Sequence, residues 1–183
     1  MKYSQGFTLV ELLVTVSIIS ILAAVATPSL LQTLAKQRMK SAAYELSATF
    51  AEARYQAALQ RVTMNVTTTG SAAVWKAASS SKKSDIHWRL IPAGSATPLL
   101  QSGVDRRISI QTDLNSISAL FLQGGTIATA ENPTTTLGQD VFFRVCDSAV
   151  NAEEGYTVVL GRFGSSRVYA GKFGTGVGAQ TCT

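Results

Sequence analysis

Residues 6–28 read GFTLVELLVTVSIISILAAVATP, and this stretch decides the fold class of the chain. The 20 residues from Phe7 to Ala26 carry a single charge, on Glu11. A helix of that length, rising about 1.5 Å per residue, reaches about 30 Å and matches the hydrocarbon core of a bilayer. The six residues before it, MKYSQG, are polar with one positive charge, Lys2. The stretch therefore predicts one membrane-spanning helix close to the N terminus.

Glu11 separates this segment from an ordinary signal peptide or anchor. An Asp at the centre of a membrane helix costs about 2.5–3.5 kcal/mol on insertion scales, and an acid kept there indicates a function. A secretory signal peptide has a shorter apolar core, followed by a cleavage site of small residues. Small residues do occur at 23–26 (AAVA), so cleavage by signal peptidase stays an alternative. Glu11 weighs against it.

The residues GFTLVE at 6–11 resemble the processing site of type IV pilins and type II secretion pseudopilins. The resemblance implies that a prepilin peptidase cuts between Gly6 and Phe7 and methylates the new N terminus at Phe7. It also implies that Glu11 pairs with the N-terminal amine of a neighbouring subunit during assembly. Pro28 lies where pilins commonly carry a proline. Because proline lacks an N–H and crowds the preceding turn, a kink or local melting of the helix is expected there.

Behind Pro28 the hydrophobic pattern becomes one-sided. Apolar residues recur at spacings of four and three from Met39 to Ala57, which indicates a stripe along one helix face. One long helix ending near Arg61 is therefore predicted, with its second half packed against a domain. Apolar and polar residues alternate at 62–67, which is typical of a half-buried strand. Further strands are expected at 73–76, 86–91, 107–110, 117–122, 141–145, 156–160 and 168–170.

A long helix followed by short strands with hairpin-length connections predicts an α+β fold with antiparallel sheet. Residues 119–126, 141–147 and 156–160 are similar to minor pilins of the FimT/FimU type and to the pseudopilin GspH. This resemblance implies the type IV pilin fold, in which the long N-terminal helix packs against antiparallel β-sheets. The expected organisation is a leader peptide at 1–6, a hydrophobic transmembrane or filament-core helix at 7–28, and a globular domain at 29–183 that includes the second half of the helix.

The residue inventory argues against an enzyme. His87 is the only histidine, so neither a zinc-binding histidine cluster nor a Ser-His-Asp triad can be assembled. No catalytic residue, metal site or cofactor is expected. The net charge of +5 is mildly basic. It favours negatively charged partners but is too small to indicate a nucleic-acid-binding protein by itself.

Members of this family that bind DNA carry a glycine-arginine-x-arginine element near the C terminus. The corresponding residues 161–168 read GRFGSSRV, so Arg162 lacks an arginine two places on and Arg167 is the remnant of the element. This departure weakens the case for a DNA receptor. Arg162, Arg167 and Lys172 are the candidate DNA contacts, and DNA is expected to be a weak partner.

The two cysteines, Cys146 and Cys182, are enough for one disulfide. A domain outside the cytoplasmic membrane enters an oxidising compartment, where an even pair usually couples. The bond would close a separation of 36 residues. In the chain-entropy model such a closure stabilises the fold by roughly 3–4 kcal/mol. Two free thiols are the alternative.

The expected function is that of a minor pilin, a structural subunit that helps prime type IV pilus assembly or forms the pilus tip complex. One alternative is a DNA-binding minor pilin for DNA uptake in natural transformation, and another is a type II secretion pseudopilin. The expected partners are other pilins and minor pilins, the prepilin peptidase, and the inner membrane before assembly. The expected location is the bacterial inner membrane, with a periplasmic domain, and then the pilus at the cell surface.

Overall fold

The computed structural model describes residues 7–68, 74–75, 86–103, 107–112, 118–129, 138–147, 150 and 154–174. The chain divides into two compact units, Met1–Leu34 and Ala35–Thr183. A single helix, α1 (Leu9–Gln60), contributes to both units. Every residue from 7 to 34 is exposed, whereas one face of the helix after residue 34 is buried. The change from an all-round apolar to a one-sided pattern in the sequence is therefore confirmed.

Local side-chain and backbone chemistry sets both ends of α1. The backbone N–H of Glu11 donates a hydrogen bond to Oγ1 of Thr8 at 3.3 Å, so Thr8 is the N-cap. Thr8 and Glu11 stand in the T-x-x-E spacing of a capping box. At the other end Arg61 adopts a φ of 53°, the left-handed conformation in which helices commonly stop.

Helix α1 is continuous through Pro28, so the local melting expected there is not observed. Proline removes one backbone hydrogen bond, and the surrounding turns keep theirs. The hydroxyl of Thr27 donates to the carbonyl of Ala23 at 2.6 Å and adds a bond beside the proline. A kink at Pro28 stays a prediction.

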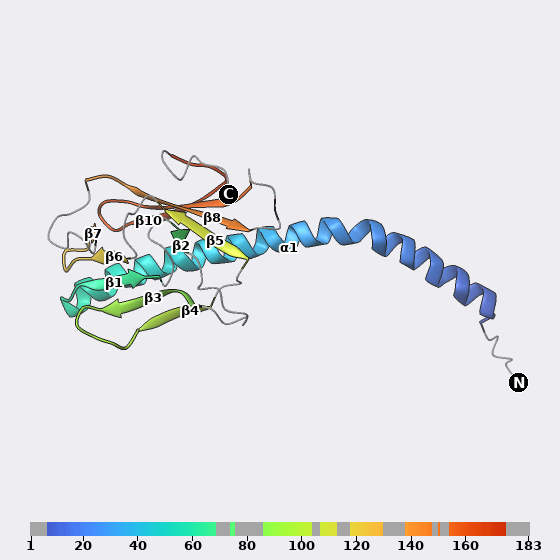
Figure 1. The fold of residues 1–183 in the computed structure, drawn as a ribbon, viewed down its shortest axis with the longest axis horizontal. Helices are drawn as coiled ribbons and strands as arrows, with labels where there is room; N and C mark the ends of the chain where they lie inside the picture. Colours follow the sequence, from blue (N-terminus) through green and yellow to red (C-terminus); the bar gives the residue numbers. More distant parts are fainter. Residues whose placement is uncertain are drawn as a thin grey trace, which may run out of the picture. The chain divides into compact units, whose positions relative to one another are not determined.

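The described part of the globular unit contains two antiparallel sheets of five strands each (Figure 1). Strand order in the first sheet is β4-β3-β1-β6-β7, and in the second β10-β9-β8-β5-β2. The strands are β1 (Met64–Thr67), β2 (Val74–Trp75), β3 (Ile86–Pro92), β4 (Leu100–Gly103), β5 (Ile108–Thr112), β6 (Ser118–Phe121), β7 (Ile127–Thr129), β8 (Val141–Asp147), β9 (Tyr156–Leu160) and β10 (Ser166–Ala170).

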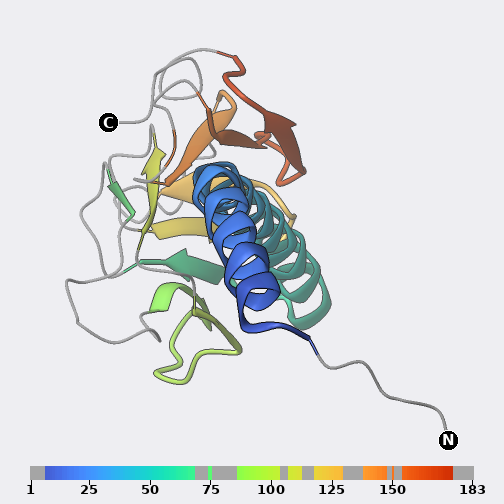
Figure 2. The ribbon, with the colours of Figure 1, turned by 90° about the vertical axis from the view of Figure 1, so that its right-hand side faces the viewer.

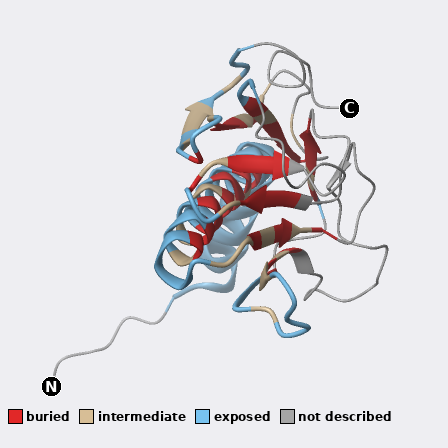
Figure 3. Ribbon diagram, turned by 90° about the vertical axis from the view of Figure 1, so that its left-hand side faces the viewer, coloured by how far each residue is buried: buried red, intermediate tan, exposed pale blue. Residues whose placement is uncertain are grey.

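The buried face of α1 packs against both sheets, and Figure 3 shows the buried residues gathered between helix and strands. The ring of Phe50 lies 5.9 Å from that of Phe121 in the first sheet and 5.0 Å from that of Phe143 in the second, centroid to centroid. Trp88 is fully buried, and its Nε1 donates to Oγ1 of Thr49 at 3.0 Å. The buried face of one helix and the facing strands of both sheets thus form a single hydrophobic core. The expected α+β architecture, a long helix packed against antiparallel sheets, is confirmed.

All eight expected strands are present within a few residues of their expected bounds, and the structure adds two more, β4 and β7. Strand β4 lies in the segment 92–103. Pro92, Gly94 and Pro98 in that segment favour turns, so its sequence does not predict a strand. Strand β7 has three residues and pairs with β6 across a tight turn at Gly124-Gly125. Both form by pairing with a longer neighbour, and local sequence pattern carries little signal for strands of this kind.

Candidate functional site

The first candidate site is the apolar segment of α1 in the N-terminal unit. Its large apolar side chains are strongly exposed, as 74% for Phe7 and 81% for Leu9 illustrate. Among the described residues, Leu9–Gln60 is a helix long and apolar enough to cross a membrane, judged by length and composition. Gly6 lies outside the described residues, so of the two residues at the expected cleavage site the structure describes only Phe7.

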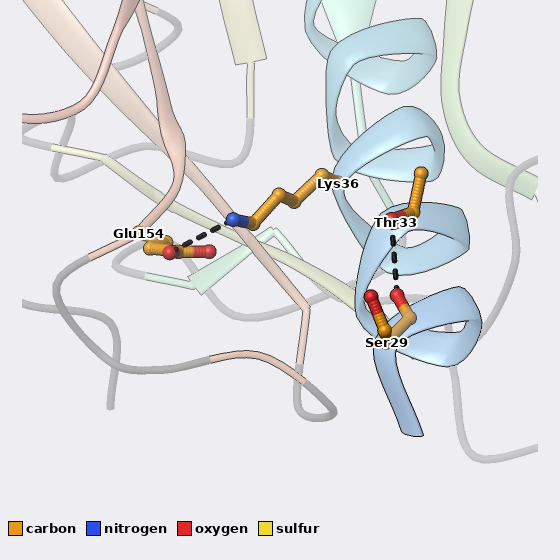
Figure 4. Close-up of polar contacts among 4 residues, drawn as sticks. All are labelled: Ser29, Thr33, Lys36 and Glu154. Carbon is orange, nitrogen blue, oxygen red and sulfur yellow. Dashed lines mark hydrogen bonds and ion pairs between the residues drawn. The ribbon is translucent and has the colours of Figure 1, made fainter. Parts of the chain in front are cut away.

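Several hydroxyl groups of this segment have hydrogen-bond partners within the helix. Four of them donate to carbonyls three or four residues back at 2.6–2.8 Å, from Thr15, Ser17, Ser20 and Thr27. Such bonds satisfy polar groups where water is absent. Thr33 repeats the arrangement further along, donating to the Ser29 carbonyl at 3.0 Å (Figure 4).

The Glu11 carboxylate is the one ionisable group between Phe7 and Ala26. It lies in the first turn of α1, where the helix dipole presents positive partial charge. Its own backbone N–H is bound to Thr8. Sequence reasoning assigned Glu11 to pairing between subunits and did not note its T-x-x-E spacing from the N-cap Thr8, which is readable from the sequence.

The second candidate site is the connection between β9 and β10. Arg162 and Arg167 line one depression of about 360 Å³, together with Phe163, Tyr169, Phe173 and the carboxylate of Asp140. The guanidinium carbon of Arg162 lies 4.8 Å from the centre of the Phe163 ring, a cation–π geometry. We call the exposed residues Arg162, Phe163 and Arg167 the basic tip.

Two observations limit the basic tip as an anion site. Lys172 is exposed but does not line the depression, so the structure brings together two of the three expected basic residues. The Asp140 carboxylate accepts a hydrogen bond from the backbone N–H of Arg162 at 3.2 Å. A negative charge at that distance lowers the positive potential that a phosphate would meet.

Arg144, which was not singled out from the sequence, holds the segment after β10 against β8 by a hydrogen bond. It is fully buried in β8, and its Nη1 donates to Oγ1 of Thr157 at 3.3 Å and to the Gly171 carbonyl. The Thr157 hydroxyl donates to the same carbonyl at 2.8 Å. A Cβ on Gly174 would lie 2.2 Å from the Phe142 ring, so the chain after β10 lies close against β8.

Cys146 belongs to the same strand as Arg144, two residues further on, so the two side chains share one face of β8. Cys146 is 2% exposed, and the described part of the chain contains no free cysteine. Cys182 lies outside the described residues. The Cys146–Cys182 bond therefore remains a proposal, supported by the path of residues 171–174 against β8.

Two ion pairs tie α1 to the far end of the second sheet. Nζ of Lys36 lies 3.0 Å from Oε1 of Glu154 (Figure 4), with both side chains about half exposed. Nε of Arg38 lies 3.7 Å from Oδ2 of Asp147, whose side chain is fully buried. Among the described residues, no three histidine, cysteine or acidic side chains come together as a metal site.

The comparisons with known proteins agree with these features. Residues 1–27 match the family described as "Prokaryotic N-terminal methylation motif". The chain is similar to crystal structures of the type IV minor pilin FimU of Pseudomonas aeruginosa in two crystal forms. One has 18% identity over 79% of this chain and 92% of that chain, with a TM-score of 0.50. The other has 18% identity over 78% and 95%, with a TM-score of 0.48. No curated protein sequence matches.

The likeness to FimU concerns the fold, and the motif concerns the N terminus. Together they cover both units of the chain: a methylation motif with its apolar helix in front, and the two-sheet pilin fold behind. The chain therefore carries a prokaryotic N-terminal methylation motif, and its fold resembles that of the type IV minor pilin FimU.

Proposed function

We propose that this protein is a minor pilin, a non-enzymatic structural subunit that helps prime type IV pilus assembly or forms part of the pilus tip. Before assembly it is held in the bacterial inner membrane by the apolar segment of α1, with the globular unit in the periplasm. After cleavage and methylation by the prepilin peptidase it joins other pilins and minor pilins at the cell surface. The observation that carries the proposal is Glu11 in an otherwise uncharged, exposed helical segment that lies within a methylation motif.

Glu11 has two candidate roles that one substitution separates. As a helix cap it acts through the capping box, in which Gln serves as well as Glu. As a partner for the N-terminal amine of a neighbouring subunit it acts through its charge, which Gln lacks. Two opposite charges that are each costly in lipid become tolerable as a pair, so the pair also fixes the axial register of adjacent helices.

The test is filament incorporation of Glu11→Gln and Thr8→Val, each expressed beside wild-type partner pilins. We expect Glu11→Gln to enter the membrane normally and to be depleted from sheared pili. We expect Thr8→Val, which removes the cap oxygen and keeps the charge, to be incorporated close to the wild-type level. If Glu11→Gln is incorporated normally, the charge-pair role is wrong.

Processing at Gly6 is tested independently by mass. We expect the mature protein to begin at methylated Phe7, and Gly6→Leu to leave the leader attached, because a bulky residue replaces the glycine of the cleavage site. Intact-mass measurement on protein from the native membrane reads both outcomes. A mature terminus beyond Ala23 would mean ordinary signal-peptide cleavage, and the minor-pilin proposal would fail.

A DNA-binding minor pilin is the second candidate, because Arg162 and Arg167 line one depression. Asp140 in that depression, and the missing second arginine of the family element, favour the structural role instead. A type II secretion pseudopilin shares both the motif and the fold class. Recovery of the protein from sheared pili, as against a secretion filament, separates that alternative.

A further inference from the structure

Helix α1 and the β3–β4 hairpin enclose a groove of about 540 Å³ that the pilin fold does not explain. We call it the acidic groove. Its lining includes two glutamates, Glu45 and Glu52, the polar residues Gln56 and Gln60, and the leucines Leu99 and Leu100. Leu99 is 52% exposed and Leu100 39% exposed, so apolar surface is open to a partner at its outer edge.

Hydrogen bonds fix the polar side of the acidic groove. Oε1 of Glu45 accepts from the Ser102 hydroxyl at 2.6 Å, which ties the helix to β4. Oε1 of Glu52 accepts from the Gln56 amide at 2.7 Å, and the Gln56 oxygen accepts from Gln60 at 2.7 Å. Two carboxylates are thus held in place along one wall, facing exposed leucines on the other.

The basic tip lies on the opposite flank of the same helix. Figures 1 and 2 place the β3–β4 hairpin and the β9–β10 hairpin on opposite sides of α1. A Cβ on Gly164, next to Phe163, would meet the Arg54 side chain at 3.2 Å, so the tip stands level with residue 54 of the helix. The acidic groove runs from residue 45 to residue 60 and is centred at the same level.

The two surfaces are complementary in charge and in apolar character. The tip offers two arginines around Phe163, which is 61% exposed. The groove offers two glutamates and two exposed leucines. We infer that the acidic groove receives the basic tip of a second copy of this chain, with Phe163 against the leucines and Arg162 and Arg167 beside the glutamates.

The placement of the two surfaces determines what such a contact builds. Tip and groove are different patches, so the contact is heterologous and leaves one tip and one groove open on every pair. A heterologous contact that does not close into a ring continues as an open helical assembly. Both patches lie near one level of α1 and on opposite flanks, so a copy bound at the groove leaves the tip of the first copy accessible on its other flank.

Cysteine crosslinking between two differently tagged full-length copies in the membrane tests this inference. One copy carries Leu99→Cys and the other Phe163→Cys, and a short bismaleimide is added to membranes. We expect a mixed dimer from this pair. The unsubstituted chain reports any background from Cys146 and Cys182, and copies carrying the same substitution should not exceed that background, because neither residue faces itself in a heterologous contact.

Charge reversal then tests the chemistry of the contact. Glu52→Arg in the groove copy should lower the crosslinked fraction about two- to fivefold, as loss of an exposed ion pair implies. Arg162→Glu in the tip copy should restore the yield when combined with Glu52→Arg, whereas Lys40→Glu, on exposed helix surface, should change nothing. Restoration by the paired reversal is an outcome that a merely structural effect of either substitution would not produce.

Three results would overturn the inference: no mixed dimer, a mixed dimer that is insensitive to both reversals, or capture of another pilin by the Leu99→Cys copy in place of the second copy. The readout is taken in membranes, and it can be repeated with the Gly6→Leu chain that is not processed. Failure of this contact is therefore distinguishable from failure of the minor-pilin proposal.

Discussion

Phe50→Ala is expected to lower the free energy of unfolding of the globular unit, because Phe50 packs α1 against both sheets. The Phe50 side chain is fully buried, and its ring contacts one phenylalanine from each sheet, Phe121 and Phe143. Truncating a buried phenylalanine to alanine costs about 3–5 kcal/mol, because apolar contact is lost and a cavity remains. Since the surrounding residues belong to three separate elements, the site cannot collapse by moving one of them, which favours the upper part of that range.

The assay is thermal and urea unfolding of the full-length chain in detergent micelles, followed by tryptophan fluorescence, to which the buried Trp88 contributes. For a domain of about 150 residues a loss of 1 kcal/mol lowers Tm by roughly 2–4 °C, so we expect a fall of roughly 6–20 °C. Tyr55→Ala is the matched control on the same helix. Tyr55 is 58% exposed, and its truncation should change stability by less than about 0.5 kcal/mol.

A double substitution tests the aromatic contact itself. Phe50→Leu and Phe143→Leu should show a coupling energy of about 0.5–1.5 kcal/mol, because their ring centres lie 5.0 Å apart. A loss below about 1 kcal/mol for Phe50→Ala, or additive behaviour of the two leucine variants, would refute the view that Phe50 joins the sheets.

Three further predictions concern the globular unit. Denatured protein from an oxidising compartment should show no free thiol, and reduction should destabilise it by roughly 3–4 kcal/mol; alkylation of Cys146 and Cys182 without reductant would exclude the bond. DNA binding should be weak and should vanish above roughly 150 mM salt, where the screening length is about 8 Å. Tight binding at that salt in anisotropy titrations, lost in the Arg162→Ala/Arg167→Ala variant, would instead favour DNA uptake. Lys36→Ala should cost less than about 1 kcal/mol in urea unfolding, because its ion pair is half exposed and screened by water.

Arg144 illustrates why part of the site could not be predicted. In the sequence it is a charged residue inside an apolar strand, and alternation alone would place it on a solvated face. In the structure that face is covered by the chain at Gly171, which follows Arg144 by 27 residues. The burial of a side chain on a sheet depends on what crosses the sheet, and the crossing segment belongs to another part of the sequence.

The sequence by itself predicted the apolar N-terminal helix and the fold class. A run of apolar residues long enough to cross a bilayer, one acid at Glu11 and a glycine at the expected cleavage site are local features, and their chemistry does not depend on distant contacts. The same holds for the stripe on the second half of α1 and for strands with clear alternation such as β1. A helix or a strand records its exposed and buried faces in its own period, so these elements could be predicted from their residues.

Only the tertiary structure decided which residues meet. It joined Phe50 to both sheets, brought Arg162 and Arg167 to one depression without Lys172, and opened the acidic groove between α1 and the β3–β4 hairpin. Each of these depends on the order of strands in the sheets and on the flank of the helix that each hairpin covers. Contacts of that kind join segments far apart in the chain, where side-chain period carries no information about pairing.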